Sequence, residues 1–368
     1  PQGLDLEVHP LRFYPHATSA AHVLGFLVRD NRSSSDELSF FNYRLPDFRG
    51  RVGIEGLFDP QLRGKAGVKS VLVNSLGYRQ SEQIWSDGEP GLNVVLTLDL
   101  IIQRAAENAL RSRGANTRGA VVVMDVRNGN ILALASLPAF DPNAYVQGIS
   151  HSYMEWLRNE EQRPQLNRAM QENYAPGSIF KIIISLACLE GGLDPKEKIT
   201  HPGYIYVGRR LIDDTAPAGE YDFHLGFIRS SNAYFITNGI KVGIESIVRI
   251  AQQFHLGEQT GLLPHQETPG YLPSRSEIQV GWTPGDTANM CMGQGRLSVT
   301  PLQMAIMTAA VANGGKVLWP RLVDRIEPQG MHTIEEVEHF PIRPPREILD
   351  VAPRTLEIVR DAMRADVE

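Results

Sequence analysis

The pattern of hydrophobic and polar positions changes character close to residue 91. Before this point, short apolar runs alternate with Gly and Pro, which predicts strands near residues 20–30 and 68–75. After it, longer helical patterns dominate. We therefore expect a β-rich accessory domain over residues 1–91 and a second domain over residues 92–368.

The second domain opens with a predicted strand over 93–98 and a helix over 100–110, with Asp99 at its N-cap position. Two aliphatic runs then flank Asn128-Gly129, a preferred sequence for a two-residue hairpin turn. The spacing of apolar residues predicts further helices over 150–160, 178–190, 224–254, 301–313 and from Pro353 onward. A hairpin accompanied by many helices predicts an α+β fold with an antiparallel sheet.

Composition and charge exclude several classes of protein. Hydrophobic residues make up 42% of the 368 positions and charged residues 21%, which is typical of a folded chain rather than a disordered one. The net charge of −6 offers no broad electrostatic reason to bind nucleic acid. The two cysteines are too few for a disulfide scaffold or a thiolate zinc site.

Two features of the sequence concern attachment to a membrane. No run approaches the roughly 18 consecutive apolar residues that a membrane-spanning helix needs. The chain begins with Pro rather than Met, so we expect the natural N-terminus, and any anchor that it carries, to precede Pro1.

The strongest candidate for chemistry is the segment that begins at Ser178. Residues 179–189 are apolar nearly all round apart from Lys181, and a buried ammonium is costly unless it is paired or loses its proton. Ser178 and Lys181 are three positions apart, so they share a helix face as a nucleophile and a base. The alternative is that Ser178 caps the helix and Lys181 extends to the surface.

A second polar cluster is Ser230-Ser231-Asn232, within a helical region. Ser230 and Asn232 flank one residue, which suits a short loop that presents both side chains to a cleft. A helix cap explains the same residues equally well.

These segments together resemble the class B penicillin-binding proteins, the peptidoglycan D,D-transpeptidases. SIFK (178–181) is similar to their Ser-x-x-Lys motif, and Ser230-Ser231-Asn232 to their Ser-x-Asn motif. AAHVLGF, GIEGLFDPQLRGKAG, LTLDLIIQRAAENAL and GAVVVMDVRNGNILALASLPAFDPNAY resemble the family in the same order. WTPGDTANMCMGQGRLSVTPLQMA is similar to the elongation-type penicillin-binding protein 2 group.

The resemblance implies a penicillin-binding/serine-transpeptidase fold behind an N-terminal pedestal, and it implies roles for four residues. Ser178 is the nucleophile, Lys181 the base, Ser230 a proton relay and Asn232 the group that holds the substrate amide. No cofactor is implied. The implied partners are peptidoglycan stem peptides, β-lactam antibiotics, a SEDS-type glycan polymerase and a rod-complex scaffold protein, at the periplasmic face of the inner membrane.

The chain also departs from the family pattern. The third motif, Lys-Thr/Ser-Gly, is absent, so we expect the transpeptidase domain to be truncated after Glu368 and this piece alone to be inactive. Some relatives hold zinc near the second motif with a Cys between its Ser and Asn, where this chain has Ser231. Asp213, Asp214 and His224 lie upstream, but without a thiolate ligand we expect no metal there. We expect Cys188 and Cys291 to be buried thiols.

Two other functions remain open at this stage. A β-lactamase or D,D-carboxypeptidase of the same superfamily would release an acyl group from Ser178 quickly, whereas a transpeptidase holds a β-lactam. The long N-terminal domain argues against such a hydrolase. A non-catalytic penicillin-binding or scaffold module would differ again, since its Ser178 would lack turnover or reactivity.

Overall fold

The computed structural model describes residues 11–30, 47–76, 78–114, 116–330 and 337–367. The chain forms two compact units, each assembled from separate stretches of sequence. Unit 1 comprises residues 1–118, 135–166 and 322–341. Unit 2 comprises residues 119–134, 167–321 and 342–368. Both units combine helices with antiparallel strand pairs, as the α+β prediction requires, and the division after residue 91 stays a prediction.

Unit 1 contains small antiparallel sheets and short helices. Its strands are β1 (Leu27–Asp30), β2 (Asp47–Gly50), β3 (Val68–Val73), β4 (Arg79–Ser86), β5 (Asn93–Leu96), β13 (Val323–Glu327) and β14 (Glu338–His339). Its helices are α1 (Ala21–Leu24), α2 (Gly53–Leu57), α3 (Asp59–Arg63), α4 (Leu100–Arg111), α5 (Asn143–Gln147) and α6 (His151–Leu157). β1 pairs with β2, and β13 lies between β14 and β5.

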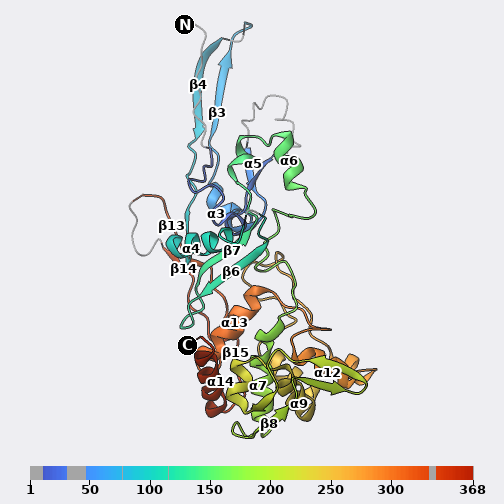
Figure 1. Cartoon of the computed structure of the whole chain (residues 1–368). Helices are drawn as coiled ribbons and strands as arrows, with labels where there is room; N and C mark the ends of the chain where they lie inside the picture. The colour runs from blue at the N-terminus through green and yellow to red at the C-terminus, as the bar shows by residue number, and fades with distance from the viewer. Residues whose placement is uncertain (1–10, 31–46, 77, 115, 331–336, 368) are drawn as a thin grey trace. The chain divides into compact units, whose positions relative to one another are not determined.

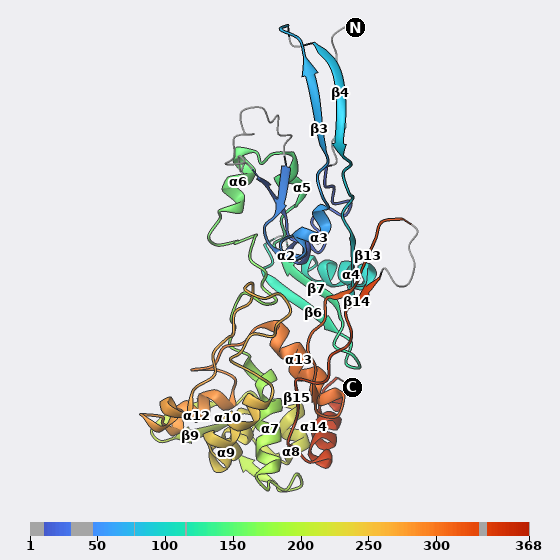
Figure 2. The same ribbon diagram turned by 180° about the vertical axis from the view of Figure 1, so that it is seen from behind.

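The pair β3 and β4 forms a long two-stranded ribbon whose residues are exposed on both faces (Figures 1 and 2). The predicted strand near 68–75 is therefore confirmed. The core of unit 1 lies elsewhere, around Phe26, Phe140 and Leu157 and around Leu27 and Val146.

The strand predicted over 20–30 is only half right. Residues Ala21–Leu24 form helix α1, and the extended run is confined to β1. Ala20 and Gly25 both have positive φ, +53° and +83°, so the backbone bends at each end of this short helix and cannot stay extended. By contrast α4 begins as predicted, because the Asp99 carboxylate accepts from the backbone N–H groups of Ile101 and Ile102.

Unit 2 is mainly helical. Its helices are η2 (a 3₁₀ turn, Gly177–Phe180), α7 (Lys181–Glu190), α8 (Phe223–Ile228), α9 (Asn232–Val242), α10 (Ile244–Gln253), α11 (Arg275–Gln279), α12 (Pro284–Cys291), α13 (Pro301–Ala312) and α14 (Pro353–Ala365). Its strand pairs are β6 (Gly119–Met124) with the start of β7 (Ile131–Leu137), β8 (Ile199–His201) with β11 (Gly219–Tyr221), β9 (Tyr204–Val207) with β10 (Arg210–Asp213), and β12 (Lys316–Val317) with β15 (Glu347–Ile348).

Helix α7 is the central element of unit 2. It packs against α9, α10 and α14, and residues Lys181–Cys188 are all buried (Figure 2). This explains why its sequence is apolar on every side, since no face of the helix meets water.

Two predictions for unit 2 need correction. The helix predicted over 224–254 is three helices, because Ser230 (φ +51°) and Gly243 (φ +83°) interrupt an apolar pattern that runs across them. The hairpin exists, but its turn is longer than two residues: Asp125 N donates to Asn130 O, and Gly129 takes φ +82°. The Asp125 side chain accepts from Arg127 N, which favours this wider loop.

Among the residues described, no helix combines the length and the hydrophobicity needed to cross a bilayer.

Candidate active site

Ser178 lies in a short 3₁₀ turn that leads directly into α7. The turn, η2, starts at Gly177, whose φ is +60°, and ends where Lys181 begins α7. Ser178 is exposed, whereas Lys181 is only 2% exposed. The structure therefore places a reachable hydroxyl beside a buried amine, and Lys181 does not extend to the surface.

The Lys181 ammonium has a partner for each of its three N–H groups. Nζ donates to Ser230 O at 2.5 Å, to Ser230 Oγ at 3.0 Å and to Asn232 Oδ1 at 2.8 Å. A buried cation is tolerated only when such partners replace water. The four predicted site residues are thus gathered in one place, although some 50 positions separate the two motifs.

Ser230 links Ser178 to Lys181. Ser230 Oγ accepts from Lys181 Nζ and donates to Ser178 Oγ at 2.9 Å. Each hydroxyl can both donate and accept, so the same chain can carry a proton in the reverse direction, from Ser178 through Ser230 to a neutral Lys181. The prediction that Lys181 accepts the serine proton stays a prediction, and the hydrogen bonds offer a route for that proton through Ser230.

Burial changes the acidity of Lys181. Desolvation lowers the pKa of this ammonium from 10.5 to about 8, and the charges of Asp214 and Cys291 act in the opposite direction. The lysine consequently titrates near physiological pH, where a base must be able both to accept and to release a proton.

The backbone at Ser230 is held in a strained conformation. Its φ of +51° lies in the left-handed region, which costs a non-glycine residue about 1–3 kcal/mol. The carbonyl of Ser230 accepts from Thr215 Oγ1 at 2.6 Å as well as from Lys181. The next residue, Ser231, is the N-cap of α9. The prediction that this motif caps a helix is therefore confirmed for Ser231.

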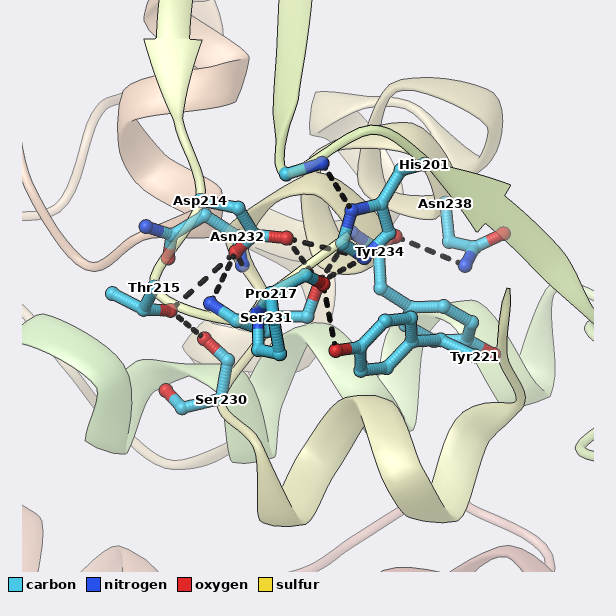
Figure 3. Close-up of polar contacts among 12 residues, drawn as sticks. His201, Asp214, Thr215, Pro217, Tyr221, Ser230, Ser231, Asn232, Tyr234 and Asn238 are labelled. Atoms are coloured by element: carbon cyan, nitrogen blue, oxygen red, sulfur yellow. Dashed lines mark hydrogen bonds and ion pairs between the residues drawn. The ribbon is translucent and has the colours of Figure 1, made fainter. Parts of the chain in front are cut away.

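Asp214 and His201 are polar groups at this site that the sequence did not assign to it. Asp214 accepts from Asn232 N and Ser231 Oγ, and His201 Nε2 lies 3.2 Å from Ser231 Oγ (Figure 3). From the sequence, Asp214 is a candidate only for metal binding, and His201 carries no signal that links it to the site. Asp213 and His224, named beside Asp214, are both exposed.

The residues near the second motif do not fit a zinc ion. Zinc sites in proteins are built from thiolate, imidazole and carboxylate ligands, and here a serine hydroxyl occupies the central position. Ser231 Oγ is engaged by Asp214, and only His201 and Asp214 remain as metal-binding types. Within the described part of the chain, no cluster of three or more His, Cys, Asp or Glu side chains could hold a metal.

The two cysteines are buried thiols, as predicted. Cys188 and Cys291 are 3% and 0% exposed. Burial raises the pKa of the Cys188 thiol to about 12 and raises that of Cys291 as well, so neither thiol is poised to react.

The backbone around Gly293 supports the turn that carries Ser178. Gly177 N donates to Gly293 O at 2.9 Å. Gly293 has φ +65°, and a Cβ there would lie 2.0 Å from Gly177 O. The Gly293-Gln294-Gly295 sequence therefore packs directly behind the segment that holds Ser178, which requires glycine at position 293.

We expect Gly293→Ala to destabilise the protein more than its backbone angle alone explains. A positive φ costs alanine about 1–2 kcal/mol, and the contact with Gly177 adds to that cost. Gly281 is the matched control, because its φ is +91° but a Cβ there meets open space. Urea unfolding should show a clearly larger loss for Gly293→Ala than for Gly281→Ala; equal losses would contradict the packing argument.

The chain is similar to penicillin-binding proteins along nearly its whole length. Residues 119–368 match the family described as penicillin binding protein transpeptidase domain, and residues 1–96 match the penicillin-binding protein dimerisation domain. Peptidoglycan D,D-transpeptidase MrdA of Acinetobacter baumannii is 31% identical over 330 residues, which is 87% of this chain and 48% of that protein.

Solved structures show the same fold. Penicillin-binding protein 2 of Helicobacter pylori, in complex with MreC, superposes with a TM-score of 0.75 at 27% identity, covering 96% of this chain and 63% of that one. A chain from a peptidoglycan synthase complex, described as coordinating polymerization and crosslinking, gives a TM-score of 0.76 at 31% identity, covering 96% of this chain and 62% of that one. The predicted transpeptidase fold and the resemblance to penicillin-binding protein 2 are confirmed.

The chain spans between 48% and 59% of the length of the first curated relatives that it matches. The transpeptidase match alone covers more than half of the chain and includes all four predicted site residues. On this evidence, the chain belongs to the penicillin-binding protein transpeptidase family.

Proposed function

We propose that the protein is a peptidoglycan D,D-transpeptidase that forms an acyl-enzyme at Ser178 during cell-wall elongation. The observation that supports this best is the hydrogen-bonded chain from the exposed Ser178 Oγ, through Ser230 Oγ, to the buried Lys181 Nζ. Such an arrangement activates a serine, because the lysine with its lowered pKa can receive the hydroxyl proton as the oxygen attacks.

In the acylation step, Ser178 Oγ attacks the carbonyl carbon between the two terminal D-alanines of a stem peptide. The Ser178 proton passes to Ser230 Oγ, whose own proton passes to neutral Lys181. Backbone N–H groups, including that of Ser178, stabilise the oxyanion. As the C–N bond breaks, the proton returns along the same relay to the amine of the departing D-alanine.

Asn232 orients the substrate in this scheme. Its Oδ1 accepts from Lys181, which directs the Nδ2 amide to donate to a carbonyl of the stem peptide. An amine from a neighbouring strand then attacks the acyl-enzyme and forms the crosslink. A β-lactam would acylate Ser178 by the same first step. No cofactor takes part.

The relatives supply the cellular setting of the proposal. The Helicobacter pylori protein was solved with MreC, and the synthase complex couples polymerization with crosslinking. We therefore propose a rod-complex scaffold protein and a SEDS-type glycan polymerase as partners, with the N-terminal part as a pedestal and the whole protein anchored in the inner membrane with its active site in the periplasm.

The proposal is tested by intact mass spectrometry of the full-length protein with a fluorescent penicillin. We expect a gain of one drug mass per chain that persists for many minutes, and a crosslinked product when donor and acceptor stem peptides are supplied. Rapid loss of the adduct with hydrolysed drug would instead indicate a β-lactamase or carboxypeptidase. A folded full-length protein that never gains mass would indicate a non-catalytic module.

A further inference from the structure

The loop that carries Ser230 and Asn232 is held from one side by residues that follow strand β10. Asp214 and Thr215 come directly after β10 and reach all three residues of the loop (Figure 3). Apart from these residues, the loop is held by Lys181 and by the caps of α8 and α9.

Asp214 provides the largest number of these contacts. Its side chain is 0% exposed. Oδ1 accepts from Asn232 N at 2.5 Å and from Ala216 N at 3.3 Å, and Oδ2 accepts from Ser231 Oγ at 2.7 Å. Hydrogen bonds to a buried carboxylate are charge-assisted and stronger than neutral ones, so they resist displacement of the loop.

His201 completes the environment of Asp214. Gly203 N donates to His201 Nδ1, which leaves the ring proton on Nε2, 3.2 Å from Asp214 Oδ2 and from Ser231 Oγ. The imidazole is buried and stacks on Tyr221 with 4.5 Å between ring centroids. The ring is therefore held in place with Nε2 facing the carboxylate.

Thr215 connects this network to the strained residue. Its Oγ1 donates to Ser230 O, the same carbonyl that accepts from Lys181. Ser230 has φ +51°, and a strained backbone persists only where its surroundings hold it. The bonds from residues 214 and 215 supply that restraint at Ser230 and at the two residues that follow it.

We propose that Asp214 is a positioning residue for acyl transfer: with His201, Ser231 and Thr215 it forms a metal-free network that sets the orientation of Ser230 and Asn232 toward Ser178 and Lys181. The inference rests on the proposed function, because its main effect is on acylation of Ser178.

The test compares Asp214→Asn with Asp213→Asn in the full-length protein. The two changes remove the same charge at adjacent positions, but Asp213 is exposed and outside the network. We expect the second-order rate constant for acylation by fluorescent penicillin to fall about 10- to 100-fold in Asp214→Asn and to stay within about twofold of wild type in Asp213→Asn. Equal rates in the two variants would overturn the proposal.

The pH dependence of the acylation rate tests whether the charge of Asp214 acts on Lys181. Asp214 and the Cys291 thiol are the titratable groups whose charge acts on Lys181, and the charge of Asp214 favours the protonated lysine. The midpoint of the acylation profile should therefore move to lower pH in Asp214→Asn. An unchanged midpoint would contradict this effect of the Asp214 charge on Lys181, whereas a lower rate in the folded variant still measures the loss of orientation of Ser230 and Asn232.

Metal content provides a readout that does not depend on activity. Purified wild-type protein should contain far less than one zinc per chain, and a chelator should leave the acylation rate unchanged. Stoichiometric zinc, or a rate that falls with chelation, would refute the metal-free network.

Two further measurements guard against ambiguous results. If Asp214→Asn does not fold, Thr215→Ala decides, since Thr215 is exposed: a several-fold slower acylation supports the proposal and an unchanged rate overturns it. If the wild type itself is never acylated, the proposed function fails instead. Amide exchange over residues 229–234 still tests the network, because it should be faster in Asp214→Asn than in Asp213→Asn.

Discussion

Ser178→Ala is expected to abolish covalent labelling by fluorescent penicillin while leaving the fold intact. The hydroxyl of Ser178 is exposed, and its hydrogen bond is to the hydroxyl of Ser230 rather than to a buried backbone group. Its loss should therefore cost little stability, whereas no other group at this position can form the acyl bond. Intact mass spectrometry after incubation with the drug measures the outcome directly.

The matched control is Ser276→Ala, another exposed serine in unit 2 that lies on helix α11. It should label like the wild type. Retained labelling in Ser178→Ala would mean that a different nucleophile is acylated. Ser230 would then be the first to investigate, because its Oγ is also bonded to Lys181.

Replacement of Lys181 is expected to slow acylation about 10²- to 10⁴-fold, which is the usual contribution of a general base. Lys181→Met removes the amine, and Lys181→Arg keeps a positive charge on a group that does not deprotonate in proteins. If Lys181 acts as the base, arginine should be no better than methionine. Recovery of activity in Lys181→Arg would show that charge alone is required. Lys241→Met, at an exposed lysine of α9, is the control.

The pH dependence of the wild type follows from the same lysine. Burial lowers the pKa of Lys181 to about 8, and only the neutral amine can accept the proton. Acylation should therefore accelerate about tenfold for each pH unit below 8 and level off above it. Stopped-flow labelling between pH 6 and 10 measures the profile, and Lys181→Met should lose this dependence. A wild-type profile that is flat through pH 8 would exclude Lys181 as the base.

Several features of this protein could be predicted from local sequence because local physics decides them. Helix α7 is one: its run of apolar residues favours a buried helix, and Ser178 and Lys181 are placed three positions apart by the chain itself. Helix α4 is another, since the Asp99 cap depends only on backbone N–H groups two and three positions later in the chain. The strand at 68–75 likewise follows from its own β-branched residues.

Other features could not be read from local patterns, because they depend on residues that meet only in the folded chain. The apolar spacing over 224–254 continues through two breaks, and Ser230 adopts its strained φ because Thr215 and Lys181 hold its carbonyl. In the same way, the hairpin loop is held by a distant residue, because Arg321 N donates to Gly129 O.

The candidate site likewise combines features set by local sequence with features set by tertiary contacts. The sequence by itself pointed to Ser178 and Lys181 as the candidate nucleophile and base, because a lone cation in an apolar helix is costly unless it has a partner. Only the tertiary structure decided that the amine reaches Ser178 through Ser230, and that Asp214 and His201 hold the second motif. These contacts join residues that are distant in sequence, and no local propensity encodes which distant carboxylate will face which backbone N–H group.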